Sequence, residues 1–217
     1  MRKRKLARAA LAASMTVGAA VGAGPSVAAG AASPLGQASE RAYRAGQLAG
    51  DSPEARQRFA EGIALARQGL QRDPHDPSAL LWLAGNLGGE ALTHGKLYAL
   101  RVIGEIERTL LQLEHDDPAY DHAAAARVLG RLYHKAPSVI SVGSNRKAAA
   151  YLEEALARAP DFPGNWAFAA DFYLDRHDCA RAKPLADRLR AAGDLDRFGV
   201  DGREWREIAA HVADDCH

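Results

Sequence analysis

Three eight-residue segments decide the fold: LLWLAGNL at residues 80–87, ARVLGRLY at 126–133 and WAFAADFY at 166–173. In each one, small residues interrupt large apolar residues at a spacing of three to four, which is typical of a helix. After the second segment, Ala148, Leu152, Ala155 and Pro160 follow at the steps of a second, packed helix. The small residues let two helices approach closely, and the large ones fill the space beside the next pair. The pattern predicts repeated helical hairpins.

The spacing of these segments matches the tetratricopeptide (TPR) repeat, whose period is 34 residues. Ala, Leu, Arg and Glu dominate beyond residue 36, and prolines recur where one helix should end or the next begin. We predict an all-α fold of TPR-like hairpins that form a compact, irregular superhelix with a C-terminal capping helix. The expected helices cover residues 36–49, 53–72, 77–93, 96–115, 118–136, 145–159, 163–175, 179–192 and 201–213.

The first residues read as an export signal. Arg2 to Lys5 form a basic start, Leu6 to Ala23 are mostly small and apolar, and Pro25 follows. Cleavage after Ala29 or Ala31 fits a small-x-small frame, and Ala31 is the preferred site. An uncleaved membrane anchor is the alternative, but the segment is poor in Leu. A lipid-anchor Cys is missing, so we expect a soluble periplasmic protein.

The expected organisation has four parts. Residues 1–31 are the signal peptide, 32–52 a linker with a first short helix, 53–194 the TPR-like domain and 195–217 the capping helix. The chain has 217 residues, and its first 32 hold five basic side chains and no acid, which leaves 23 basic against 27 acidic ones. This mildly acidic body argues against nucleic-acid binding, which needs a dense cationic field.

Charged residues on the predicted first helices of the repeats suggest a binding groove. Such helices line the concave face of stacked hairpins, and a basic stripe on one should face two acids on the next. The residues are Arg127, Arg131, His134, Lys135, Asp171 and Asp175. They could line a groove for a peptide or anionic ligand, or Arg131 could pair with Asp171 and simply join the repeats. Trp82 and Trp166 are interpreted as core rather than as ligand platforms.

An insertion interrupts the regular repeat at residues 135–145. Long connections in compact helical domains are usually functional, so we predict that this segment borders the binding site. The alternative is that Val139, Ile140 and Val142 belong to the core.

Cys179 and Cys216 are the two cysteines of the chain. Export would place them in an oxidising compartment where disulfides persist. The sequence alone does not show whether their Cα atoms lie close enough for a disulfide. Either a bridge within the chain or free or intermolecular thiols are therefore compatible with it.

The stretch from Leu80 to Leu189 resembles the TPR-like T component of TRAP transporters, the TatT family. The matching motifs are WLAGNLG (82–88), GKLYAL (95–100), LGRLYHKAP (129–137), SVGS (141–144) and YLEEALARAPDFPGN (151–165). The resemblance implies a periplasmic, non-enzymatic protein that partners a solute-binding subunit, with a hydrophobic small ligand as the alternative cargo. The missing lipid-anchor Cys departs from the anchored members.

Motifs of enzymes and metal sites are not found in the sequence. The eight histidines are scattered, and the chain has no phosphate loop, dinucleotide motif or nucleophile elbow in its mature part. We therefore expect no cofactor, no metal and no catalytic residues. A protein-interaction module is the predicted function, either as a transporter accessory or as a general TPR scaffold, and a carrier of a hydrophobic ligand is the alternative.

Overall fold

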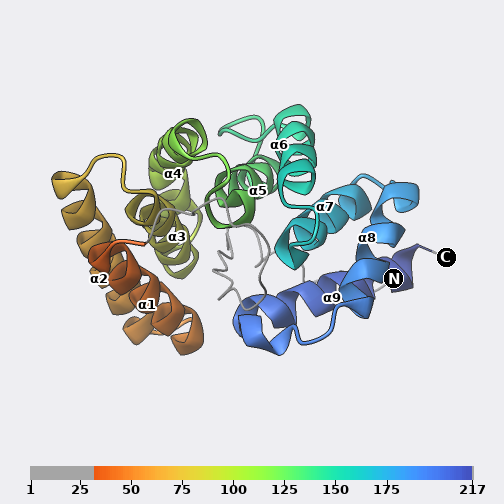
Figure 1. The fold of residues 1–217 in the computed structure, drawn as a ribbon, viewed down its shortest axis with the longest axis horizontal. Coiled ribbons are helices and arrows are strands. Elements are labelled where there is room, and N and C mark those ends of the chain that lie inside the picture. The colour runs from red at the N-terminus through yellow and green to blue at the C-terminus, as the bar shows by residue number, and fades with distance from the viewer. Residues whose placement is uncertain (1–31, 217) are drawn as a thin grey trace, which may run out of the picture.

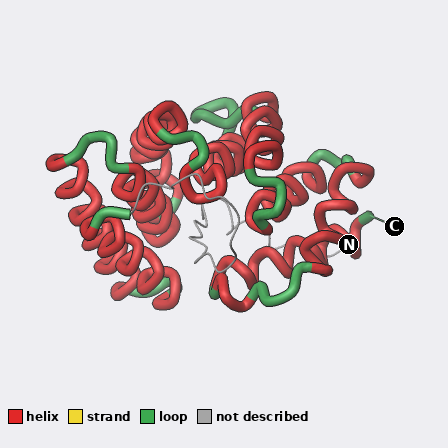
Figure 2. The backbone as a smooth tube through the Cα atoms, viewed as in Figure 1, coloured by secondary structure: helices red, strands yellow, loops and turns green. Residues whose placement is uncertain are grey.

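The structure, a computed structural model, describes residues 32–216. Within that range it contains nine α-helices, one short 3₁₀ turn at Asp196–Phe198 and no strand (Figures 1 and 2). The helices are α1 (Pro34–Ala49), α2 (Pro53–Arg72), α3 (Pro77–His94), α4 (Lys96–Asp116), α5 (Tyr120–Lys135), α6 (Asn145–Arg158), α7 (Pro163–Asp175), α8 (Cys179–Ala191) and α9 (Val200–Asp215).

Local capping explains where these helices begin. Ser33, Ser52 and Asp76 each precede a proline, which suits the first helical position because it needs no backbone N–H there. The hydroxyl of Ser52 accepts a hydrogen bond from the N–H of Ala55 at 3.1 Å. The carboxylate of Asp76 accepts the N–H of Ala79 in the same way. Each cap satisfies a backbone donor that the first turn leaves free.

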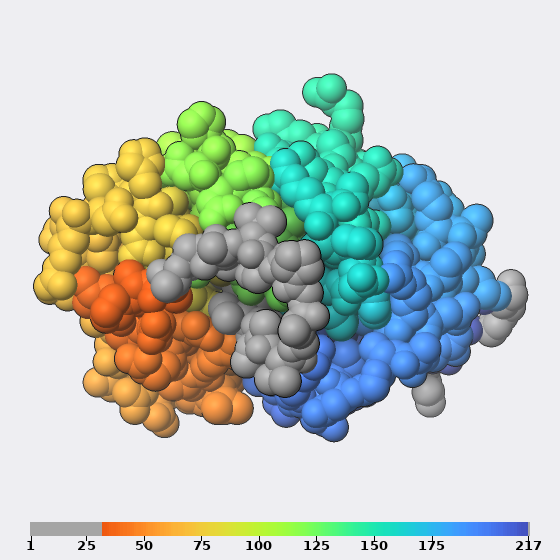
Figure 3. Space-filling model, in the orientation of Figure 1, coloured from red at the N-terminus to blue at the C-terminus, as the bar shows by residue number. Residues whose placement is uncertain are grey.

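The helices pack as successive antiparallel hairpins. α1 pairs with α2, α3 with α4, α5 with α6 and α7 with α8, and α1 packs on α3 as α5 packs on α7. α9 covers the end of the array against α7 and α8. The hairpins follow one another around the molecule in chain order, from α1–α2 to α8 and α9 (Figures 1 and 3). The predicted all-α fold of TPR-like hairpins with a C-terminal capping helix is confirmed.

The first helix falls in the segment that we expected to hold a linker and a short helix. α1 has 16 residues and packs along α2 as the first hairpin.

Small residues allow the close helix packing that the sequence pattern predicts. A Cβ at Gly130 would lie 2.6 Å from Cγ of Leu152, and one at Gly89 would lie 2.4 Å from the Phe59 ring. Both distances are shorter than real carbon contacts, so only glycine fits. These two positions set how closely α5 approaches α6 and how closely α3 approaches α2.

Both tryptophans interpreted as core are buried. Trp82 is fully buried, with its ring centroid 5.3 Å from that of Tyr43 in α1. Trp166 is 8% exposed, and its Nε1 donates to the carbonyl oxygen of Pro160 at 2.6 Å. Trp82 thus joins the first helices of two hairpins, and Trp166 joins α7 to the connection that precedes it.

The insertion between α5 and α6 is a loop closed at its base. The N–H of Ser144 donates to the carbonyl of Tyr133 at 2.9 Å, and Ser144 then caps α6. Val139 is 93% exposed and Ile140 is 67% exposed, whereas Val142 packs partly against the core. The alternative that Val139 and Ile140 are core residues is therefore wrong.

The predicted signal peptide, residues 1–31, lies outside the described residues. Among the described helices, none combines the length and the apolar character that a membrane span requires.

Candidate partner-binding surface

Arg127, the first residue of the expected basic stripe, lies inside the protein. Its side chain is fully buried, and its Nη2 donates to the carboxylate of Asp121 at 3.3 Å. Its Nη1 donates to the carbonyl of His122 at 3.0 Å and to Oδ1 of Asn165 at 3.3 Å. The guanidinium also lies over the ring of Phe162, 4.6 Å from its centroid. Arg127 therefore connects the start of α5 to α7.

The turn that Arg127 holds has an unusual backbone. Asp121, His122 and Ala123 adopt positive φ angles of 45°, 59° and 61°, although none of them is glycine. Such a conformation costs an L-residue about 1–3 kcal/mol and persists only where surrounding contacts impose it. The hydrogen bonds from Arg127 and from Nδ2 of Asn165 to the carbonyl of His122 are such contacts.

Asp121 titrates far from its ordinary range. Burial raises the pKa of its carboxyl to about 7, and the neighbouring Arg127 opposes that rise. Burial also lowers the pKa of Arg127, against the attraction of Asp121. The pair is thus a costly buried charge pair whose protonation depends on pH.

We expect the carboxyl of Asp121 to make the free energy of unfolding decrease as pH rises. An unfolded Asp has a pKa of about 3.9. Between about pH 4 and pH 7 the folded state therefore binds one more proton at Asp121 than the unfolded state, so the free energy of unfolding falls as pH rises through this window. Asp121→Asn, which tolerates the left-handed backbone, should remove that slope. Urea denaturation across this pH range checks it, and equal slopes for both proteins would refute it.

Arg131, one turn further along α5, pairs with the capping helix. Its Nη2 donates to the carboxylate of Glu204 in α9, and its guanidinium lies 4.2 Å from the ring centroid of Phe168. The side chain of Arg131 is 4% exposed. The expected pairing with Asp171 is thus replaced by a contact that spans 73 residues of sequence.

His134 and Lys135 bind the two acids expected on the next first helix. The Nζ of Lys135 lies 2.8 Å from Oδ2 of Asp171 and 3.0 Å from Oδ2 of Asp175. The Nε2 of His134 lies 2.9 Å from Oδ2 of Asp175 and its Nδ1 lies 3.8 Å from Oδ2 of Asp171. Hydrogen bonds from His134 and Lys135 hold the pKa of Asp175 well below its usual range. This cluster joins the end of α5 to α7.

The six residues expected in a binding groove thus lie in three internal networks. Asp121, Asn165 and Glu204 complete these networks, and sequence reasoning did not single them out. No local signal could have found Glu204, because its contact with Arg131 depends on the path of α9. A binding role for the six residues stays a prediction. The pairs of Arg127 and Arg131 are buried whereas Asp175 is 54% exposed, and the contacts of all six with neighbouring elements favour the interpretation that they join repeats.

A groove with a mixed apolar and polar lining opens instead between the first two hairpins. It has a volume of about 330 Å³ and lies between α2, α3 and α4. Its floor is apolar, and its polar rim includes the ion pair between Arg67 and Glu105 at 2.8 Å and the hydrogen bond from Tyr98 to Glu90. Burial and that hydrogen bond raise the pKa of Tyr98 to about 12, so its hydroxyl stays a donor. The lining residues are Ala60, Ile63, Ala64, Arg67, Leu87, Glu90, Tyr98, Val102 and Glu105.

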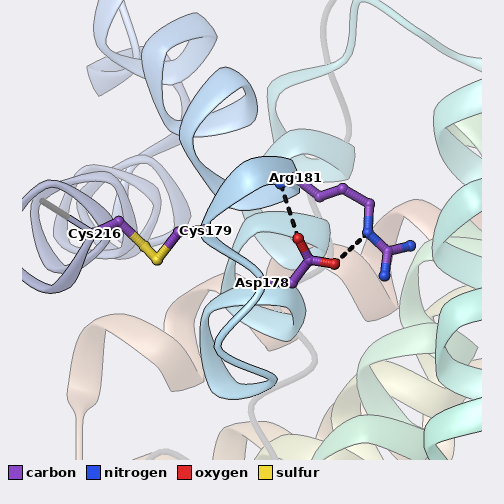
Figure 4. The surroundings of a disulfide bond; sticks show 4 residues. All are labelled: Asp178, Cys179, Arg181 and Cys216. Atoms are coloured by element: carbon purple, nitrogen blue, oxygen red, sulfur yellow. Dashed lines mark hydrogen bonds and ion pairs between the residues drawn. A yellow bond between two sulfur atoms is a disulfide. The ribbon is translucent and has the colours of Figure 1, made fainter.

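Cys179 and Cys216 are joined by a disulfide in the structure, with Cα atoms 5.5 Å apart (Figure 4). Cys179 begins α8, where Asp178 is the cap: its carboxylate accepts the N–H of Arg181 at 3.1 Å and pairs with the Arg181 Nε at 2.6 Å. Cys216 directly follows α9. The bridge therefore ties the end of the capping helix to the last hairpin.

Across residues 32–216, no group of three or more His, Cys, Asp or Glu side chains is arranged to hold a metal ion.

Comparison with known proteins adds a structural likeness. No protein-family model matches the sequence, and a search of curated proteins finds no match. Among solved structures, the chain is similar to the crystal structure of TTC0263, a thermophilic TPR protein of Thermus thermophilus. The sequence identity is 20% and the TM-score 0.39, and the match covers 81% of this chain and 99% of the other.

Proposed function

We propose that this protein is a non-enzymatic protein-interaction module. The observation that carries the proposal is the groove between α2, α3 and α4, in which exposed alanines lie beside hydrogen-bonding side chains. The alanines supply apolar contact area, and the hydrogen-bonding side chains supply polar groups that select one binding mode. Stacked helical repeats expose extended surfaces of this kind, whose usual role is partner binding.

This groove is a better candidate binding site for a short segment of another protein than the charged inner face of the repeats. Arg127 and Arg131 already have partners inside the protein. In the groove, by contrast, Ala60 and Ala64 are exposed. A partner side chain can therefore contact Ala60 and Ala64 without breaking an internal ion pair.

The proposal extends to a periplasmic location and to a role in solute transport. The basic start and apolar stretch of residues 1–31 support export to the periplasm. The motifs that resemble those of the T components of TRAP transporters support a role beside a solute-binding subunit. A general scaffold and a carrier of a hydrophobic ligand are the competing proposals.

Native mass spectrometry of the protein recovered from the periplasm tests this function. We expect a mature N-terminus near residue 32 and a bound polypeptide. Ala64→Arg should place a long side chain in the groove and remove the bound polypeptide without changing the helical content. Ala157→Arg, at an exposed alanine of α6, is the matched control and should retain it.

The competing outcomes are distinct. A bound small molecule in place of a polypeptide would support the carrier instead. Equal polypeptide binding by the Ala64→Arg variant would exclude the groove as the binding site.

A further inference from the structure

One side of α4 is not covered by any other described helix. The buried residues of α4, which include Val102, Ile106 and Leu113, lie on the side that packs against the array. The residues on the other side follow one another at intervals of three or four positions, which places them along one face of a helix. Leu97 is 87% exposed and Leu111 is 38% exposed. We call this face the α4 outer stripe, and it comprises Leu97, Arg101, Gly104, Arg108 and Leu111.

The α4 outer stripe carries positive charge without an acidic partner. Arg101 and Arg108 are both exposed, and neither forms an ion pair within residues 32–216. The guanidinium of Arg101 lies over the ring of Tyr98, 4.9 Å from its centroid. The glutamates of α4 instead pair with basic side chains of neighbouring helices, as Glu105 does with Arg67, Glu107 with Lys147 and Glu114 with Arg158. The two arginines therefore remain available to carboxylates of a partner.

Gly104, in the middle of the stripe, is not required by the packing of the chain. A glycine inside a helix is less favourable than alanine, because more backbone freedom is lost when it is ordered. A Cβ at Gly104 would meet Nη1 of Arg108 at 3.5 Å, which is an ordinary contact. At Gly130, by contrast, a Cβ would collide with Leu152. The missing side chain at Gly104 instead leaves the backbone of α4 accessible from outside, between the two leucines of the stripe.

We propose that the α4 outer stripe binds an acidic amphipathic helix of a partner protein. Leu97 and Leu111 pack against apolar side chains of that helix, and the two helix axes come closest at Gly104, because the side chains at a crossing set the distance between the axes. Arg101 and Arg108 are seven positions apart. They pair with carboxylates that repeat at the same spacing on the partner, as flanking charges do between packed helices. This surface is additional to the groove of the proposed function, because no residue of the stripe lines that groove.

The charges argue against other occupants. In a dimer of this chain with antiparallel α4 helices crossing at Gly104, Arg101 would lie near Arg108 of the other copy, and in a parallel dimer each arginine would lie near its own equivalent. Like charges in such positions repel. Residues 1–31 contain no Asp or Glu, so they cannot supply the carboxylates. A lipid surface would gain little apolar contact from two leucines that are separated by a glycine and two arginines.

Binding of a synthetic helical peptide to the purified full chain tests the proposal. The probe is a peptide in which leucine, alanine and glutamate each repeat every seven residues, and fluorescence anisotropy measures its affinity. It should bind at least about tenfold more tightly than the same peptide with lysine in place of glutamate, and added salt should reduce the difference. Gly104→Leu should weaken binding at least about tenfold, because the new side chain separates the two helices. Its urea midpoint should not fall, because leucine is the better helix former.

A charge reversal provides the specificity test. Arg101→Glu/Arg108→Glu should prefer the lysine peptide over the glutamate peptide. Arg146→Glu/Arg203→Glu is the matched control, because it makes the same change of net charge at two exposed arginines outside α4 and should keep the original preference. Ala64→Arg, which blocks the groove, should leave binding of this peptide unchanged, so the two surfaces are tested separately.

Three outcomes would overturn the proposal. They are no binding of the glutamate peptide by the wild type, equal binding by the Gly104→Leu variant, and an unchanged preference after the charge reversal at Arg101 and Arg108. Vesicles of anionic lipid that bind the wild type but not the charge-reversed variant, without binding of the peptide, would assign the stripe to a lipid surface instead.

Discussion

At pH 8, above the pKa of Asp121, replacing Arg127 with methionine is expected to lower the free energy of unfolding by about 3–5 kcal/mol, because it leaves the buried Asp121 carboxylate without its partner. It also removes the donors that hold the carbonyls of the left-handed turn. Urea denaturation monitored by circular dichroism measures the change. Arg146→Met, which removes an exposed arginine with no partner in the described chain, is the control and should stay within about 0.5 kcal/mol of the wild type.

The double variant Asp121→Asn/Arg127→Met shows whether the charge pair is the cause. It should be more stable than Arg127→Met alone, since it removes the uncompensated charge together with its partner. A loss below about 1 kcal/mol for Arg127→Met would mean that the turn does not depend on this side chain.

Removing the disulfide is expected to have the second large effect. The bridge joins residues separated by 37 positions, and a loop of that size contributes about 4 kcal/mol in the chain-entropy model. Replacing Cys179 and Cys216 with serine should therefore lower the free energy of unfolding by about 2–5 kcal/mol. α9 should lose protection from hydrogen exchange before the hairpins do, because the bridge ties its C-terminal end.

A thiol titration provides the chemical check. The oxidised, denatured wild-type protein should react with no thiol reagent, and the reduced protein should react at both cysteines. Two reactive thiols per chain before reduction would refute the bridge. A single cysteine variant is an unsuitable control, because its remaining thiol can form intermolecular disulfides, so the double variant is used.

Local chemistry explains why the helices could be predicted so closely. The predicted helix at 163–175 matches α7 at both ends, because Pro163 starts it and the turn before Asp178 ends it. The prediction for α5 began two residues early, at 118 rather than 120. The left-handed turn at Asp121 was missed altogether. Its conformation depends on Arg127 and on the distant Asn165, which no local pattern links to it.

The candidate site was harder to predict for the same physical reason. The helical spacing of Arg127, Arg131 and Lys135 predicted one charged face, and these residues do point to neighbouring elements. Whether that face is open or covered depends on α9, whose Glu204 returns to Arg131 across 73 residues. The spacing of apolar and polar residues shows which side chains share a helix face. Whether that face is buried depends on which distant element covers it.

The return of α9 also reaches the first hairpin, and this changes how the protein should unfold. The Nε2 of Gln47 in α1 donates to the carboxylate of Asp201 in α9 at 3.2 Å, across 154 residues. In an open solenoid each repeat contacts only its neighbours, so terminal repeats can melt while the centre stays folded. Here the two ends support each other, so loss of either end removes contacts from the other. We therefore expect the melting of the two ends to be coupled, and folding to be slower than the local helical contacts alone would give.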